Sequence, residues 1–206
     1  IWLVSMLALP VEILSMEINP ILIQYVSKSL NLLTINFISI SIASICMMAL
    51  ITCFFNLSRI ENRGIMSVAT IFGIVGFLSF LIGNMQNYFF IYRLAPIYNS
   101  LSTDLTPLIS IFGTTKLDYG IISFGCTGFW FFTVSLLALT NKNIPLKLVL
   151  ISLSIGIISI TLIFLSFSSS PIYIAWLFTI YVFLLIVWTI MESFFLSKLS
   201  TASKAI

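Results

Sequence analysis

Long hydrophobic runs separated by short polar stretches dominate the pattern of the chain. A bilayer core about 30 Å thick is crossed by about 20 apolar residues in an α-helix, which rises about 1.5 Å per residue. Polar interruptions, such as Asn19 with Pro20 and the stretch 168–171, delimit runs of that length. The pattern therefore predicts an all-α, polytopic transmembrane helix bundle of six spans, forming a single domain over residues 1–206. The expected spans are about 1–18, 32–55, 65–91, 119–140, 146–167 and 172–195.

Two of the connections are more than turns. Residues 19–31 segregate apolar and polar side chains at helical spacing but are too few to span, so we expect an outer interfacial segment. Residues 92–118 are less hydrophilic than a flexible linker of this size, and we expect an ordered outer cap lying on the bundle. The chain begins with Ile1 inside an apolar run and without a basic leader, so we also expect a short segment to precede it in the full-length protein.

Composition and charge support a membrane location and an orientation. Of 206 residues, 60% are hydrophobic and 7% charged, and mean hydropathy is +1.20, whereas soluble domains are about a quarter charged. With six spans, loops 56–64 and 141–147 and the C-terminal tail hold six of the nine basic residues. Basic residues favour the cytoplasmic side, so both termini are expected there. The predicted location is a cell membrane, specifically a bacterial inner membrane, with the lipid bilayer as the first partner and another membrane protein as a further candidate.

The absence of histidine excludes several kinds of chemistry. Bis-histidine haem, His-ligated metal sites and Ser-His-Asp or Cys-His nucleophile pairs all need that residue. Cys46, Cys53 and Cys126 lack a C-x-x-C spacing, and we interpret them as small buried packing residues. No cofactor and no metal are therefore expected. The formal charge of +3 is small and dispersed, which argues against a nucleic-acid partner.

Glycines mark the expected contact between the third and fourth spans. Helices in lipid associate mainly through close packing at small residues. Gly73, Gly76 and Gly83 lie on one stripe of the third span, and Gly125 and Gly128 lie on one face of the fourth. We interpret these stripes as packing surfaces that bring the two spans together. The alternative is a glycine-lined substrate path.

Polar residues inside the spans supply the candidate binding site. Inserting an ionisable side chain at mid-bilayer costs about 2.5–3.5 kcal/mol of free energy on insertion scales, so such a residue is a candidate for a functional role. Glu12 is expected to be protonated or hydrogen-bonded, with Asn84 or Asn87 as its partner. The topology brings six polar residues to the outer side of the membrane, where they are expected to form a vestibule. The vestibule is either a binding site or a hydrogen-bond cluster that fixes helix register. Its members are Glu12, Asn84, Asn87, Arg93, Asp104 and Asp118.

Glu192, near the inner end of the last span, has a plainer interpretation. A carboxylate at the inner interface is expected to be solvated or paired with a nearby lysine such as Lys198.

Several short motifs resemble a family of bacterial six-span membrane proteins known only as a domain of unknown function. These motifs are Tyr119 with Gly120, the aromatic stretch 125–130, the Ile-Pro loop within 141–146, and Ala175 with Trp176. They cover the second half of the chain. The resemblance implies the six-span architecture and no particular activity.

No catalytic template fits the polar residues. A phosphate-binding loop and a dinucleotide fingerprint are absent from the sequence, and the carboxylates show no spacing typical of a hydrolase. The favoured function is non-enzymatic binding or scaffolding in the membrane. The first alternative is a small transporter or ion-coupled permease using Glu12, although the two halves show no inverted repeat. The others are an intramembrane enzyme acting on lipid and a subunit of a larger respiratory or photosynthetic assembly.

Overall fold

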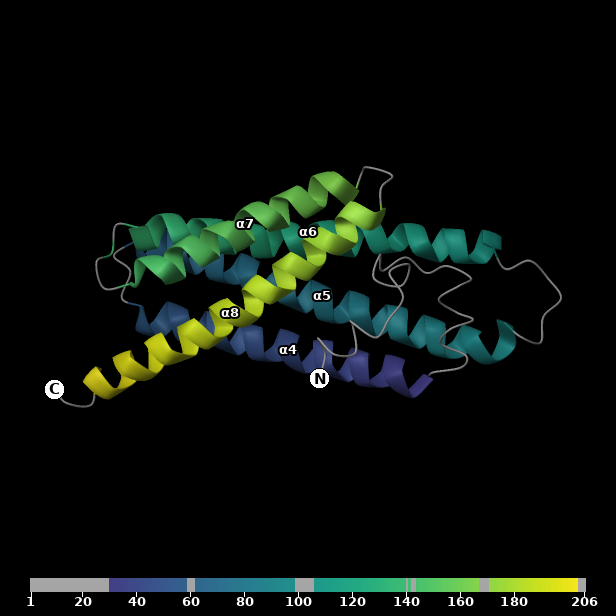
Figure 1. The fold of residues 1–206 in the computed structure, drawn as a ribbon, viewed down its shortest axis with the longest axis horizontal. Helices are drawn as coiled ribbons and strands as arrows, with labels where there is room; N and C mark the ends of the chain where they lie inside the picture. The colour runs from purple at the N-terminus through teal and green to yellow at the C-terminus, as the bar shows by residue number, and fades with distance from the viewer. Residues whose placement is uncertain are drawn as a thin grey trace.

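Five long helices make up the part of the chain that the structure describes. The computed structural model describes residues 30–58, 62–98, 106–139, 141, 144–166 and 171–203. The all-α prediction is confirmed for these residues, and each helix is long and apolar enough to cross a membrane. The expected first span, 1–18, lies outside the described residues, as does the segment 19–31 apart from its last two positions. The helices, labelled in Figure 1, are α4 (Leu30–Leu57), α5 (Arg63–Tyr98), α6 (Thr106–Leu139), α7 (Leu146–Ser166) and α8 (Pro171–Ser203).

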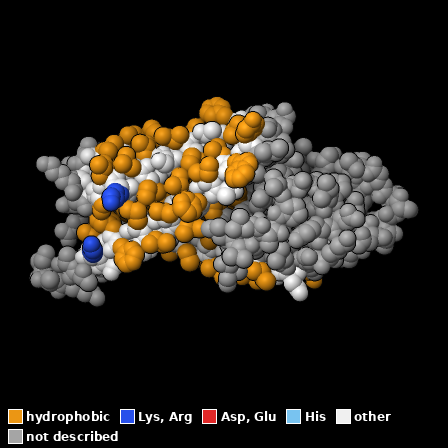
Figure 2. Space-filling model, viewed as in Figure 1, with side chains coloured by type: hydrophobic (Ala, Val, Ile, Leu, Met, Phe, Trp, Pro, Cys, Tyr) orange, Lys and Arg blue, Asp and Glu red, His pale blue; other side chains and the backbone are white. Residues whose placement is uncertain are grey.

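The surface of the helices is that of a membrane protein. Figure 2 shows hydrophobic side chains spread over the described part of the visible face, with basic side chains towards its left end. Phe164 and Phe194 are 71% and 70% exposed, and Trp176 is 66% exposed. Soluble monomers rarely expose continuous apolar surface of this kind, because water would have to cover it. The surface and the length of the described helices are those of a membrane protein.

Local sequence signals set the helix ends. The side-chain oxygen of Asn62 accepts a bond from the Ile65 amide at 3.4 Å, which makes Asn62 the N-terminal cap of α5. Pro171 occupies the first position of α8, where its missing amide hydrogen costs nothing. Between α6 and α7 the chain turns tightly, and the Ile144 amide donates to the Asn141 carbonyl at 3.2 Å. Short connections of this kind make consecutive helices antiparallel neighbours.

Each helix packs on the next one along the chain. The contacts of α6 with α5 and with α7 are the most extensive, and α8 packs on α7. Figure 1 shows α8 crossing the bundle obliquely, so that part of it also comes to lie against α4. The last helix therefore closes the bundle against the first one described, with a smaller contact than the others make.

Three helices are clearly longer than the sequence pattern predicts, and one of them is α8, which continues to Ser203 instead of ending near residue 195. α5 has 36 residues and α6 has 34, against 21 for α7, and both project beyond α7 in Figure 1. The expected cap over 92–118 is therefore wrong for the described residues, because 92–98 continue α5 and 106–118 begin α6. A helix that leaves the bilayer still satisfies its own backbone hydrogen bonds, and Thr106 followed by Pro107 is a favourable helix start.

Aromatic rings fill the centre of the bundle. The rings of Trp130 and Phe131 on α6 and Trp188 on α8 are fully buried and meet edge to face, with centroids 4.7 to 5.5 Å apart. Gly73 on α5 makes room for them, since a Cβ there would lie 2.8 Å from Cγ of Trp130. This packed layer joins α5, α6 and α8 at the centre of the described bundle.

Candidate functional site

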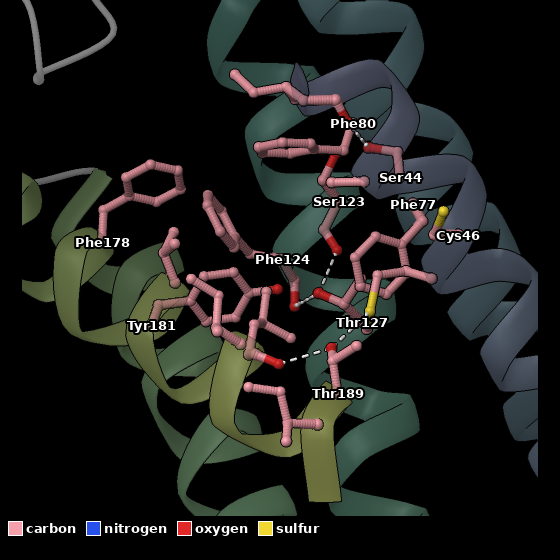
Figure 3. A pocket seen from close by; sticks show the side chains of 17 residues that line it. Ser44, Cys46, Phe77, Phe80, Ser123, Phe124, Thr127, Phe178, Tyr181 and Thr189 are labelled. Carbon is pink, nitrogen blue, oxygen red and sulfur yellow. Dashed lines mark hydrogen bonds between the residues drawn. The ribbon is translucent and has the colours of Figure 1, made fainter. Parts of the chain in front are cut away.

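A cavity of about 270 Å³ lies between α4, α5, α6 and α8. Its lining residues include Thr127 on α6 and Thr189 on α8, both labelled in Figure 3. We call it the α4–α8 cavity. Its lining residues are Ile40, Ala43, Ser44, Cys46, Met47, Phe77, Phe80, Ser123, Phe124, Thr127, Phe178, Tyr181, Val182, Leu185, Ile186, Thr189 and Ile190.

Close approach of α5 to α6 forms the back of this cavity. A Cβ at Gly76 would lie 2.8 Å from the Thr127 amide nitrogen and 3.0 Å from the Ser123 carbonyl oxygen. The two backbones are therefore nearly in contact there. α4 and α8 contact each other less extensively, and the cavity lies between them.

Aromatic side chains make one wall. The rings of Phe80, Phe124, Phe178 and Tyr181 form a continuous cluster, with neighbouring centroids 5.5 to 6.5 Å apart. Both stacked and edge-to-face pairs occur in it, as the quadrupoles of the rings favour. Figure 3 shows these rings grouped beside the space that the other lining residues surround.

Most hydroxyl groups of the cavity are satisfied within the protein. Ser44 donates to the Ile40 carbonyl at 3.0 Å, Thr127 to the Ser123 carbonyl at 2.7 Å, and Thr189 to the Leu185 carbonyl at 2.7 Å. Bonds of this kind, to the carbonyl four residues back, let a hydroxyl reside in an apolar environment. The Tyr181 hydroxyl lies near the hydroxyls of Thr127 and of Ser159 on α7, which can act as its acceptors.

Ser123 is the exception. Its side chain is 2% exposed, its hydroxyl oxygen has no hydrogen-bond partner among the described residues, and it lines the cavity. A buried polar group without a partner carries a desolvation cost, which is why such groups are uncommon in native proteins. The cavity therefore presents apolar surface and aromatic rings together with one unused hydroxyl.

The cavity opens sideways, towards the lipid. Ala43 and Cys46 on α4 line it and are exposed, as are Ile186 and Ile190 on α8, at 37% and 53%. These positions lie within the membrane-spanning parts of their helices. The side of the cavity between α4 and α8 therefore lies at the depth of the membrane-spanning segments of the described helices.

The outer polar vestibule stays a prediction. Glu12 and Asp104 lie outside the described residues, and the side chain of Asp118 does too. The amide nitrogen of Asn84 donates to the Phe37 carbonyl of α4 at 3.3 Å, Asn87 is half-buried, and Arg93 is exposed. Asn84 thus joins α5 to α4, a role the sequence did not suggest.

The glycine stripes divide between two neighbours. Gly73 and Gly76 lie against α6, as expected, and Gly83 is half-buried. Gly128 lies instead against α7, where a Cβ would be 2.9 Å from Ser159 and 3.4 Å from the Gly156 carbonyl oxygen. Its expected place against the third span is therefore wrong.

Gly125 faces the same neighbour as Gly128, since a Cβ added there would lie 3.5 Å from Cδ1 of Ile163 on α7. α6 presents a different face to each of its neighbours, and Gly125 and Gly128 lie on the face that α7 covers.

Glu192 is the residue whose sequence interpretation fails most clearly. Its side chain is fully buried, and neither carboxyl oxygen has a hydrogen-bond partner among the described residues. It is not solvated at the interface. It lies one turn beyond Trp188 on the same face of α8, and Phe195 and Leu196 are buried next in sequence. The four-residue spacing puts Trp188 and Glu192 on one face of α8, and only the structure shows that this face is buried.

Two cysteines also differ from expectation. Cys46 and Cys53 are exposed on α4, and Cys126 is half-buried, so the first two are not buried packing residues in this chain. Across the described ranges, no group of three or more Cys, Asp or Glu side chains is placed to hold a metal ion.

Comparison of the chain with known proteins identifies no relative. No family model, no curated protein and no solved structure matches the chain.

Proposed function

We propose that this integral membrane protein binds an apolar, membrane-soluble molecule in the α4–α8 cavity, without an enzymatic active site. The observation that supports the proposal is a cavity of about 270 Å³ lined by apolar and aromatic side chains. Ligand sites are typically concave, mostly apolar and supplied with a few polar groups. Its mouth at Ala43 and Ile190 faces the bilayer. Binding of this kind is the non-enzymatic function that the sequence favours.

The test is photo-crosslinking with a long-chain fatty acid that carries a diazirine, on protein in lipid nanodiscs. Label is expected on the α4 and α8 segments that line the cavity. Ala43→Trp places a large ring at the mouth and should lower labelling about tenfold, corresponding to about 1.4 kcal/mol of binding free energy. Ala49→Trp is the matched control, because Ala49 is exposed on the same helix and does not line the cavity. Equal labelling of both variants and the wild type would contradict the proposal.

The wider setting of this function is also part of the proposal. Six spans, with both termini in the cytoplasm of a bacterial cell, account for the six-to-three division of basic residues between the two sides. The resemblance to an uncharacterised six-span family is compatible with this arrangement. A membrane-protein partner remains a further proposal, for which the large exposed apolar surface leaves room.

Ion-coupled transport is a second candidate, and Glu192 favours it more directly than Glu12 does. An ionisable residue inside the membrane is a functional candidate by default, and Glu192 is fully buried without a partner among the described residues. The test is proton flux into proteoliposomes that contain a pH-sensitive dye. A flux seen with wild type and lost with Glu192→Gln would support transport, and the absence of flux in both would exclude proton coupling.

A further inference from the structure

The geometry points to a flat, carbonyl-bearing ring as the occupant of the α4–α8 cavity, of the kind found in quinone-type lipids, with the Ser123 hydroxyl donating to the carbonyl. This inference rests on the proposed function, since it names the class of molecule that the cavity binds. Independent observations support it: an unused donor, a wall of aromatic rings and the volume of the cavity.

The unused donor specifies the polar part of the ligand. Ser44, Thr127 and Thr189 also line the cavity, and each already donates to a carbonyl of its own helix. Only the Ser123 hydroxyl, 2% exposed, is without a partner among the described lining residues. A purely aliphatic occupant would leave this hydroxyl unsatisfied, whereas a carbonyl oxygen accepts its hydrogen.

The aromatic wall specifies the shape of the ligand. Phe80, Phe124, Phe178 and Tyr181 come from three different helices, and their rings touch one another along one side of the cavity. Aromatic groups prefer offset-stacked or edge-to-face partners, and a flat ring inserted beside this wall finds both kinds of surface. A saturated chain would also gain contact area there, but it has no ring to place in an offset-stacked or edge-to-face geometry.

The volume sets the size of the ring. A protein cavity of about 150 Å³ lined by aliphatic and aromatic residues accommodates a benzene molecule. The α4–α8 cavity, at about 270 Å³, has room for a fused two-ring system or for one substituted ring. An apolar tail attached to that ring would leave between Ala43 and Ile190 and continue into the lipid.

The test compares two ligands of nearly identical shape as competitors of the diazirine fatty acid. They are 2,3-dimethyl-1,4-naphthoquinone, which has two carbonyls and no free position for attack by Cys46, and 2,3-dimethylnaphthalene, which has none. In the wild type the quinone should compete at about a tenfold lower concentration than the hydrocarbon, as one additional hydrogen bond allows.

Substitution of the donor isolates the hydrogen bond from differences in solubility. Ser123→Ala should abolish the tenfold difference and leave competition by the hydrocarbon unchanged, and the protein should fold because the hydroxyl has no partner to lose. Ser135→Ala is the matched control: Ser135 is buried on the same helix, donates to the Phe131 carbonyl and lies outside the cavity. That variant should retain the preference for the quinone.

The outcomes separate the two proposals. If the fatty acid labels the cavity but neither ring compound competes, or if both compete equally in wild type and Ser123→Ala, the ring-carbonyl inference is overturned and the proposed function stands. If the fatty acid itself labels no cavity segment, the proposed function fails.

Discussion

The indole nitrogen of Trp188 on α8 donates a hydrogen bond of 2.7 Å to the hydroxyl of Ser152 on α7, and both side chains are buried. The Trp188 ring also meets Trp130 edge to face at 5.5 Å, although the Trp130 nitrogen has no partner among the described residues. The two tryptophans share one packing site, but only Trp188 adds a hydrogen bond to it. This bond links the obliquely placed α8 to its neighbour.

A double-mutant cycle should measure the bond between Trp188 and Ser152. Trp188→Phe and Ser152→Ala, singly and together, should give a coupling free energy of about 1 kcal/mol from unfolding in detergent, since hydrogen bonds between membrane helices are modest. The control pairs Trp188→Phe with Ser154→Ala, because Ser154 is exposed on α7 and bonds to Leu150. Coupling of equal size in the two cycles would show that the Trp188–Ser152 bond contributes nothing specific.

Gly76→Ala should destabilise the bundle. The added Cβ would lie 2.8 Å from a backbone nitrogen of α6, which cannot rotate away as a side chain would. Overpacking of this kind costs about 1–3 kcal/mol, measurable as a lower thermal midpoint in detergent. Gly120→Ala is the control, because nothing lies within 4 Å of its Cβ and alanine favours helix. A midpoint that falls equally in both variants would contradict the close contact.

Glu192→Leu should stabilise the protein. Removal of a buried carboxyl without a partner relieves its desolvation cost, and we expect a gain of about 1–3 kcal/mol in the free energy of unfolding. Glu192→Gln keeps a polar group in the same place and should gain less. If Glu192→Leu instead lowers the stability, the carboxyl has a stabilising partner in the membrane.

Single cysteines should report the orientation of α7. Leu146 and Tyr173 are 62% and 67% exposed, and they flank α7 at its start and just after its end. In a background without Cys46, Cys53 and Cys126, an impermeant thiol reagent added to intact cells should label Tyr173→Cys and not Leu146→Cys. Labelling of both from outside would exclude the proposed topology.

Hydrophobic run length predicted the described spans well, because bilayer thickness imposes it directly. It missed the projecting ends of α5 and α6 and the last eight residues of α8, where the helix continues after the need for an apolar run has ended. The pair Thr106 and Pro107 was a start signal that hydropathy does not register.

The sequence could not supply the cavity or the burial of Glu192. Both involve packing of α8 against helices that are distant in the sequence. One such contact is the hydrogen bond of 3.4 Å from the Thr189 hydroxyl to the Met47 sulfur, 142 positions away. Gly128 shows the same limit, because its place on α6 was evident while the helix it would face was not.

Under the proposed function, the opening between α4 and α8 makes the bilayer the solvent from which the cavity fills. Occupancy then depends on the mole fraction of a ligand in the surrounding lipid, and an affinity expressed per aqueous concentration combines binding with partitioning. Adding empty vesicles to a reconstituted sample would deplete the cavity by dilution within the membrane, even for a ligand that never enters water. Two compounds of equal intrinsic affinity would thus rank by their solubility in hydrocarbon.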